Sequence, residues 1–242
     1  MLLGEYTATT AIHNAIPSLM AKPHTWGKLS TGDDYFILFD YRNINQTLPD
    51  PDKFTSRLAE LHRTATSENG MFGFPVTTCD GAVPHIVAWQ KSWALFFADM
   101  LRGVLKFDTD TNGHWAELDD VFDRTISHVI PRLLGVLQSE GRELRPSLIH
   151  GDMGEGNVGT DLDTGEIIFV DASSYYAHNE MELGLWRWSE TMGRFTESYL
   201  RHFPPSEPVE EWDDRNRLYS LKTKLNMSAD HPGEDGRRIR RL

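Results

Sequence analysis

The segment LIHGDMGEGNVGTDLDTGEIIFVD, residues 148–171, decides the fold of this chain. Apolar residues at its start predict a short strand that leads into the polar sequence His150-Gly151-Asp152, and Asn157 follows in the same glycine-containing loop. Two short apolar runs on either side of a Thr-Gly turn then predict a β-hairpin. Asp171 stands at the end of the second strand of that hairpin. The segment therefore places several polar side chains at fixed separations around one loop.

The polar side chains of this segment suit phosphoryl transfer. A hairpin that folds back on the loop would bring Asp171 close to Asn157, and the two would present the hard oxygen ligands that Mg²⁺ prefers. Asp152 would stand apart on the same loop, where its carboxylate could accept a proton. Transfer of a phosphoryl group needs mainly positioning and neutralisation of charge. This arrangement is the plan of a kinase catalytic loop.

Each member of this set is common when taken alone, because a single Asp in a loop is usually a turn former or a helix cap. The whole series of strand, loop Asp, loop Asn, hairpin and final Asp is much rarer, although short motifs also arise by chance. For His150 the alternatives are direct chemistry and bracing of the loop by hydrogen bonds. We expect the bracing role.

The rest of the chain predicts helices with few strands. Two strands joined by a turn are expected within residues 24–41, where Tyr35-Phe36-Ile37-Leu38-Phe39 is strongly β-prone. Apolar residues at helical spacing predict helices over residues 5–16, 51–67, 89–107, 115–139, 180–200 and 208–225. Strands and helices do not alternate over a long stretch, so a doubly wound parallel sheet is not expected.

Composition narrows the class of protein. The 242-residue chain has a formal net charge of −12, which argues against general nucleic-acid binding, and the basic cluster at residues 237–241 is short and terminal. The single cysteine, Cys79, excludes an intrachain disulfide and is expected to be a small buried residue. No apolar run is long enough to span a membrane, and the start lacks the features of a signal peptide. The expected location is cytoplasmic.

Several separate stretches of the sequence resemble a known family. His150-Gly151-Asp152 followed by Gly156-Asn157 is similar to the aminoglycoside-phosphotransferase-like kinases. Longer stretches resemble the fructosamine and ribulosamine 3-kinases specifically, and they are residues 72–74, 77–81, 89–93, 171–183 and 206–216. The resemblance spans nearly the whole chain.

The resemblance implies an α+β, protein-kinase-like fold. Residues 44–242 would form the mostly helical C-terminal catalytic lobe with its hairpin, and residues 1–43 would be a remnant of an incomplete N-terminal β lobe together with the hinge. The implied activity is ATP- and Mg²⁺-dependent phosphorylation of the 3-hydroxyl of ketosamines, which reverses glycation. The substrates would be glycated protein lysines or small ketosamines, carrying ribulosamine and in some members also fructosamine. Neither nucleic acid nor membrane is an expected partner.

The resemblance also implies roles for individual residues. Asp152 would be the catalytic base, and Asn157 and Asp171 the metal ligands. Phe39-Asp40-Tyr41 resembles the hinge against which the adenine rests. Glu5 resembles the helix glutamate that pairs with the nucleotide-binding lysine.

Two departures from the family pattern bear on activity. The family has a glycine-rich strand pair and a phosphate-contacting lysine ahead of the glutamate, whereas residues 1–30 contain no glycine-rich phosphate loop, and Lys22 and Lys28 come after Glu5. The family usually has a Trp two residues after the catalytic Asp, and this chain has Gly154 there. An incomplete or impaired kinase is therefore an open alternative.

Two further functions compete with the kinase. A catalytically inactive relative that acts as a binding module would be consistent with the missing glycine-rich loop and lysine, but it has no physical need for Asp152, Asn157 and Asp171 together. A metal-dependent hydrolase would need more His or carboxylate ligands, and the ten His of this chain form no cluster with ligand spacing.

Overall fold

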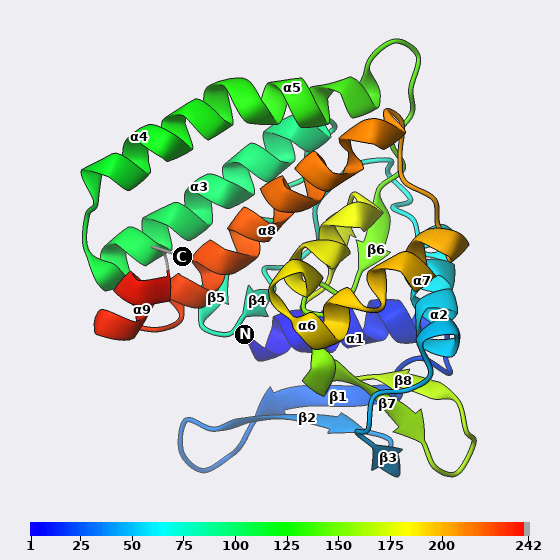
Figure 1. The fold of residues 1–242 in the computed structure, drawn as a ribbon. Helices are drawn as coiled ribbons and strands as arrows, with labels where there is room; N and C mark the ends of the chain where they lie inside the picture. Colours follow the sequence, from blue (N-terminus) through cyan, green and yellow to red (C-terminus); the bar gives the residue numbers. More distant parts are fainter. Residues whose placement is uncertain (240–242) are drawn as a thin grey trace.

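The computed structural model describes residues 1–239, in which helices build most of the molecule and short strands gather mainly on one side (Figure 1). The α-helices are α1 (Leu2–Ala15), α2 (Pro51–Thr64), α3 (Trp93–Asn112), α4 (Ala116–Arg124), α5 (Ile130–Leu134), α6 (Glu190–Gly193), α7 (Thr196–His202), α8 (Trp212–Ala229) and α9 (Glu234–Ile239). The strands are β1 (Pro23–Lys28), β2 (Tyr35–Phe39), β3 (Ile44–Asn45), β4 (Cys79–Asp80), β5 (Val83–Pro84), β6 (Ser147–Ile149), β7 (Val158–Asp161), β8 (Ile167–Phe169) and β9 (Tyr175–Ala177).

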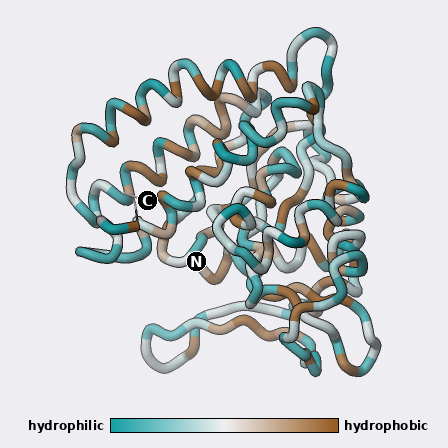
Figure 2. Tube along the Cα trace, in the orientation of Figure 1, coloured by the Kyte–Doolittle hydropathy of each residue, from teal (hydrophilic) through white to brown (hydrophobic). Residues whose placement is uncertain are grey.

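The strand pair expected near the start of the chain is confirmed. Strands β1 and β2 are antiparallel, with Trp26 opposite Ile37, and they lie at the bottom of Figure 1 below α1. Tyr35 and Leu38 remain 50% and 54% exposed on this pair. Hydrophobic residues along these strands are visible in Figure 2.

The hairpin expected after the polar loop is also confirmed. Strands β7 and β8 are antiparallel, with Val158 opposite Phe169, and β3 pairs with the other edge of β7. Strand β6, which leads into the polar loop, pairs with β9 and places Ile149 opposite Tyr175. The loop after β6 is therefore held between two small sheets.

Capping decides where the first long helices begin. The side chain of Asp50 accepts hydrogen bonds from two backbone N–H groups of the first turn of α2, which starts at Pro51 as expected. Helix α3 was expected from residue 89 but starts at Trp93, because Ser92 caps it and the backbone of Gln90 is already paired with that of Phe72. The structure therefore shortens this helix at its start and extends it to Asn112.

The helix expected over residues 115–139 is a chain of helical segments. Helix α4 passes through a π-helical turn (Thr125–Val129) into α5, and a 3₁₀ segment (Gly135–Gln138) ends the run. Pro131 lies in the first turn of α5, where its missing N–H costs little. Around this proline the run changes helix type rather than breaking.

The single helix expected over residues 180–200 is wrong in detail. The segment consists of a 3₁₀ segment (Asn179–Trp188), then α6 and α7. The side chain of Ser189 caps α6 by accepting from the backbone of Met192, and this starts a new helix at that point. A further 3₁₀ turn (Val209–Glu211) precedes α8.

An aromatic core lies directly behind the polar loop. Phe54 of α2 packs against Phe169 of β8, with ring centroids 6.0 Å apart, and against Trp186 and Phe195 at 5.8 and 5.4 Å. The indole of Trp186 donates a hydrogen bond of 2.8 Å to the carbonyl of Met153, one residue after Asp152. The core therefore fixes the backbone of the loop from behind.

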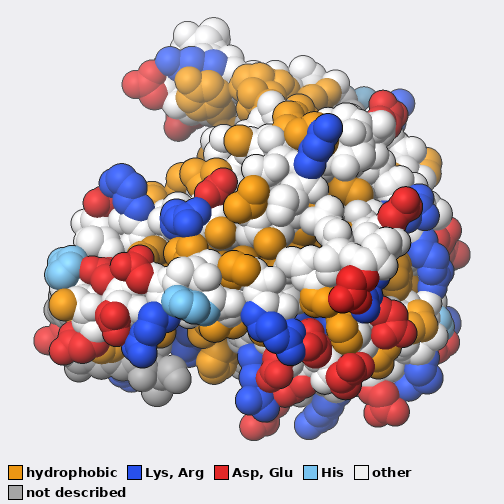
Figure 3. All heavy atoms as spheres, turned by 90° about the horizontal axis from the view of Figure 1, so that it is seen from above, with side chains coloured by type: hydrophobic (Ala, Val, Ile, Leu, Met, Phe, Trp, Pro, Cys, Tyr) orange, Lys and Arg blue, Asp and Glu red, His pale blue; other side chains and the backbone are white. Residues whose placement is uncertain are grey.

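The surface is mixed in charge. On the face shown in Figure 3, Lys and Arg side chains are interspersed with Asp and Glu side chains. No helix of the described residues is both long and apolar enough to cross a membrane. Of the basic cluster at the C-terminus, Arg240 and Arg241 lie outside the described residues. The proposed division of the chain after residue 43 and the cytoplasmic location stay predictions.

Candidate functional site

Backbone geometry shapes the turn that presents Asp152. Gly151 has φ of +90°, and a Cβ atom there would lie 2.4 Å from the carbonyl oxygen of Ser173, so only glycine fits. The backbone N–H of Ser173 donates to the carbonyl of His150 at 2.9 Å. The turn is thus pinned to the segment that follows Asp171.

Asp152 and Asn157 are joined by hydrogen bonds, whereas the sequence predicted that Asp152 would stand apart on the loop. The Asn157 Nδ2 amide donates to the backbone carbonyl of Asp152 at 2.7 Å and to its Oδ2 at 2.9 Å. Burial raises the pKa of Asp152 to about 6, the negative charge of Asp80 adds to the rise, and the hydrogen bond from Asn157 opposes it. Within the described residues Asp152 Oδ1 and Asn157 Oδ1 accept no side-chain or backbone hydrogen bond.

Asp171 lies where the hairpin brings it back to the loop. The N–H of Val170 donates to the carbonyl of Asn157 at 3.0 Å, so Asp171 follows directly after a backbone contact with the loop. Asp171 has φ of +59°, an uncommon conformation for a residue other than glycine, and its side chain is exposed. A free carboxylate and a free amide oxygen form a donor set that fits Mg²⁺.

Two cavities open beside Asp171, and the lining of neither includes Asp152 or Asn157. The first has a volume of about 270 Å³ and is lined by Glu5, Thr9, Met20, Ala21, Phe39, Asp40, Arg42, Ile44, Phe169, Val170 and Asp171. The second has a volume of about 250 Å³ and is lined by Met1, Glu5, Cys79, Gly81, Asp171 and Ala172. Glu5 and Asp171 line both, so the two cavities meet at this pair of carboxylates.

The predicted nucleotide-binding residues divide between the first cavity and the surface. Phe39 and Asp40 line the first cavity, whereas Tyr41 is 88% exposed and is absent from its lining. Asp40 contacts His24 Nε2 through Oδ1 at 2.6 Å, and its N–H donates to the carbonyl of Lys22. The structure therefore brings two of the three expected hinge residues to the cavity.

Glu5 stands in an acidic setting. Burial raises the pKa of the Glu5 carboxyl, and the nearby negative charge of Asp171 raises it further. Among the described residues that line the second cavity, none has a basic side chain. The basic group that the resemblance assigns to Glu5 is therefore not supplied by the lining of that cavity.

Arg42 is a cavity residue that the sequence did not single out. Its Nη1 atom lies 3.3 Å from Asp161 Oδ2, while its buried Nε atom has no hydrogen-bond partner among the described residues. The guanidinium thus carries an unused donor at the edge of the first cavity. No motif around Arg42 in the sequence marks it as a cavity residue.

The buried carboxylate of Glu182 fixes the backbone of the polar loop. Glu182 Oε2 accepts from the backbone N–H of His150 at 2.5 Å, and Oε1 accepts from that of Gly151 at 3.0 Å. The fully buried His62 lies 3.4 Å from Glu182 Oε2 and binds the Tyr199 hydroxyl at 2.7 Å. Burial alone would raise the pKa of Glu182, but the contacts with His62 and His150 outweigh it and lower that pKa.

The expected role of His150 agrees with this geometry. Its Nε2 atom lies 2.9 Å from the carbonyl of Val170, and its ring is completely buried. Burial lowers the pKa of His150, which keeps the ring neutral. His150 therefore braces the loop against the hairpin strand rather than facing either cavity. His62 is a hydrogen-bonded residue of the core.

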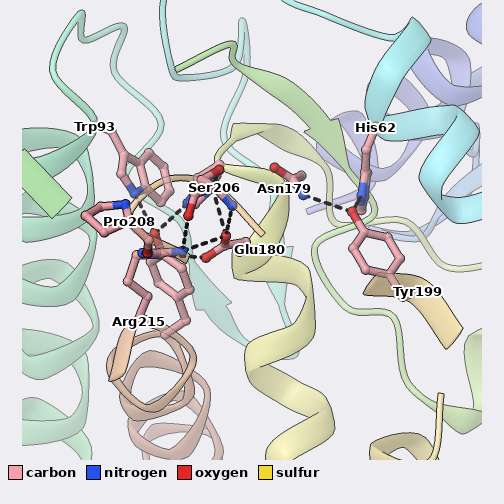
Figure 4. A network of polar contacts seen from close by, with 10 residues as sticks. His62, Trp93, Asn179, Glu180, Tyr199, Ser206, Pro208 and Arg215 are labelled. Carbon is pink, nitrogen blue, oxygen red and sulfur yellow. Dashed lines mark hydrogen bonds and ion pairs between the residues drawn. The ribbon is translucent and has the colours of Figure 1, made fainter. Parts of the chain in front are cut away.

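A second buried network surrounds Glu180, two residues before Glu182. Arg215 donates to both carboxylate oxygens of Glu180 at 2.8 and 2.9 Å and to the carbonyls of Ser206 and Pro208 at 2.8 Å each. Figure 4 shows these contacts beside the pairing of His62 with Tyr199. Since both carboxylates are fully partnered, the segment that carries them is fixed relative to α8 and α2.

Cys79 differs from its expected setting. The prediction of a buried side chain is wrong, because Cys79 is only partly buried and lines the second cavity. The turn between β4 and β5 lies at this cavity, whereas the sequence indicated no more than a strand entering a turn. Within the described residues, no group of three or more His, Cys, Asp or Glu side chains is arranged to hold a metal ion.

Comparisons with known proteins identify the family that this chain matches. The profile of the fructosamine kinase family matches residues 1–240. A protein-ribulosamine 3-kinase of chloroplasts from Oryza sativa subsp. indica is 30% identical over 228 residues, which are 94% of this chain and 64% of that relative, so this chain spans somewhat less than two thirds of its length.

Solved structures show the fold. A Haemophilus somnus 129PT protein described as a fructosamine-3-kinase superposes with a TM-score of 0.74 at 18% identity, covering 100% of this chain and 77% of its own. The aminoglycoside phosphotransferase APH(4)-Ia, in a complex with AMP-PNP and hygromycin B, gives a TM-score of 0.56 at 17% identity and covers 98% and 79%. The expected protein-kinase-like α+β fold is confirmed.

Proposed function

The chain belongs to the fructosamine kinase family, and from this premise we propose that it transfers the γ-phosphoryl group of Mg·ATP to the 3-hydroxyl of ketosamines. The acceptors would be ribulosamine, and also fructosamine, on protein lysines or on small amines. The observation that carries the proposal is the hydrogen-bonded pair of Asp152 and Asn157, together with Asp171, which lines both cavities directly after the backbone contact of Val170 with Asn157. The consequence of the reaction would be removal of the sugar from the glycated amine.

Asp152 is the proposed catalytic base. The Asn157 amide engages Oδ2 of Asp152 and holds the carboxylate in one orientation, which leaves Oδ1 to receive the proton of the acceptor hydroxyl. Glu182 and the core around Trp186 keep the loop backbone in place while this happens. A positioned base of this kind contributes roughly 10²–10⁴-fold to rate.

Asn157 and Asp171 are the proposed holders of Mg²⁺. When bound, the metal would supply positive charge that neutralises the phosphates of the nucleotide. The first cavity, with Phe39 and Asp40 in its lining, would take the adenine and ribose, and Tyr41 would extend this hinge toward solvent. The second cavity would face the phosphates and the acceptor. Glu5 lines both cavities and would order a phosphate-contacting cation.

One observation favours a second candidate, a binding module without turnover. The lining of the second cavity, within the described residues, carries the carboxylates of Glu5 and Asp171 and no basic side chain. Triphosphate binding usually needs such a cation, and removal of one charge stabiliser costs about 10²–10³ in rate. Ligand binding with no phosphate transfer would be the behaviour of this candidate.

A transfer assay separates the two candidates. Purified chain is incubated with ATP, Mg²⁺ and ribulosyl-lysine, and the product is identified by phosphorus NMR as the 3-phosphate. We expect transfer by the natural chain and a loss of roughly 10²–10⁴-fold in Asp152→Asn, which keeps the shape of the side chain. Transfer at an unchanged rate in Asp152→Asn would remove Asp152 from the base role. A folded chain that binds ATP and transfers nothing would be the binding module.

A further inference from the structure

A buried lysine lies close to the proposed catalytic base and has no part in the function described so far. The side chain of Lys222, on α8, is only 3% exposed. Its Nζ atom lies 3.0 Å from His85 Nε2 and 3.5 Å from Asp80 Oδ2. A buried ammonium group is costly unless it is paired, so the position of Lys222 calls for an explanation.

One face of helix α8 contacts the β4–β5 turn. Lys222, Asn226 and Asp230 follow one another at intervals of four residues, which places them on the same side of the helix. The Asn226 amide donates to the carbonyl of Asp80 at 3.3 Å, and Asp230 Oδ1 accepts from the N–H of Ala82 at 2.8 Å. These two contacts already tie the backbone of the turn to side chains of the helix segment. The charged pair of Lys222 and Asp80 is therefore not needed to hold the turn on the helix.

His85 directs the ammonium group of Lys222. Burial and the adjacent charge of Lys222 lower the pKa of His85 well below its usual value, so its ring is neutral. A neutral ring carries one N–H, and Nδ1 lies 3.1 Å from the hydroxyl of Thr78, which itself donates to the carbonyl of Ser174 at 3.3 Å. Nε2 is then the acceptor for Lys222. Of the three donors of Lys222, this hydrogen bond uses one.

The pair lies next to the reaction site. Cys79 and Gly81, on either side of Asp80, line the second cavity together with Asp171. The charges of Asp80 and Lys222 both act on Asp152, in opposite directions. The side chain of Asp80 is 22% exposed, so its carboxylate is open to a ligand while Lys222 stays behind it.

We propose that Asp80, held in place by Lys222 behind it, recognises the sugar of the acceptor by accepting a hydrogen bond from a hydroxyl beside the one that is phosphorylated. The proposal rests on the proposed function, since it assumes a ketosamine acceptor next to Asp152. A sugar hydroxyl can donate, and the Asp80 carboxylate is a partly exposed acceptor whose orientation is held by the Lys222 ammonium 3.5 Å away. Sites built to bind a hydroxyl reject analogues that lack it, because their buried polar groups are then left unpaired.

Binding of ribulosyl-lysine without nucleotide tests the proposal by calorimetry. We expect Asp80→Asn and Lys222→Met each to weaken binding roughly tenfold to hundredfold, the range for a hydrogen bond to a charged group. Lys224→Met is the matched control, because Lys224 lies on the same helix with its ammonium 4.5 Å from the ring centroid of Trp188 and away from Asp80. The control should bind as the natural chain does.

A ketosamine lacking the hydroxyl next to the reacting one separates recognition from a merely structural role. The natural chain should bind this analogue roughly tenfold to hundredfold more weakly than ribulosyl-lysine, whereas Lys222→Met and Asp80→Asn should bind both ligands almost equally. Each variant is first shown to be folded by thermal unfolding, and Asp80→Asn serves alone if Lys222→Met does not fold.

Three results would overturn the inference: no binding of ketosamine by the natural chain, unchanged affinity in folded variants, or an equal penalty for the analogue in variants and natural chain. Binding with the expected pattern but without phosphate transfer would instead overturn the proposed function and leave the recognition element standing.

Discussion

Replacement of Glu182 by Gln tests the anchoring of the polar loop. Glu182 is 3% exposed and accepts two backbone N–H groups from His150 and Gly151. Gln keeps one acceptor oxygen and turns an N–H group toward the second donor, so one hydrogen bond to a charge is lost and one buried donor is left without a partner. Removing one side of a buried charged arrangement costs about 3–5 kcal/mol. For a domain of this size, that corresponds to a fall in Tm of roughly 6–20 °C.

Thermal unfolding at pH 7 followed by circular dichroism measures this difference. Glu197→Gln is the control, because the Glu197 side chain is 92% exposed and its ion pair with Arg201 is 3.9 Å long, so a change within about 0.5 kcal/mol is expected. The pKa of Glu182 is lowered from 4.5, so its carboxylate stabilises the fold fully above pH 4.5 and loses that effect as pH falls through the folded value. The gap between natural chain and Glu182→Gln should therefore narrow in acid. A Tm within about 2 °C of the natural chain at pH 7 would refute the anchoring role.

Two further predictions concern the loop and the buried network. Gly151→Ala should lower stability and phosphate transfer together, since its Cβ would lie 2.4 Å from the Ser173 carbonyl at a φ that costs about 1–3 kcal/mol. Gly156→Ala, where a Cβ meets nothing within 4 Å, should change little, and equal melting of the two variants would contradict this. Burial lowers the pKa of His178 to about 4 from 6.5, so the unfolded chain binds more protons below pH 6.5. As the pH falls from 6.5 to 4, the free energy of unfolding measured by urea titration should then fall by about 1.4 kcal/mol per pH unit. In His178→Gln the free energy of unfolding should depend less steeply on pH.

Local patterns predicted the parts of the molecule that depend on neighbours in sequence. The hairpin of β7 and β8 follows from two apolar runs around a Thr-Gly turn, whereas the hydrogen bond of Asn157 with Asp152 was not predicted, since Asp152 was expected to stand apart. The strands β1 and β2 follow from β-prone residues on both sides of a turn. These features are set by turn chemistry and propensity, which a short window of sequence contains.

Such local patterns could not predict contacts between residues that are distant in sequence. Glu182 lies 32 residues from His150, and Lys222 lies 137 residues from His85, and no periodicity reports either contact. The same holds for the start of α3, which was placed too early because the backbone of Gln90 pairs with Phe72 instead of entering the helix. A buried charged residue on a helix looks in sequence like any solvated one, and only tertiary structure supplies its partner.

Calorimetric titration of ATP into the 242-residue chain, with and without Mg²⁺, tests most directly whether Asn157 and Asp171 form one metal-dependent nucleotide site. The account predicts binding that depends on Mg²⁺ and weakens at least roughly tenfold in Asp171→Ala, since a hydrogen bond or ligand to a charged group has about that value. Asp163→Ala, an exposed carboxylate in the turn of the same hairpin, should bind as the natural chain does. Absence of ATP binding, or equal affinity in Asp171→Ala and the natural chain, would contradict the account.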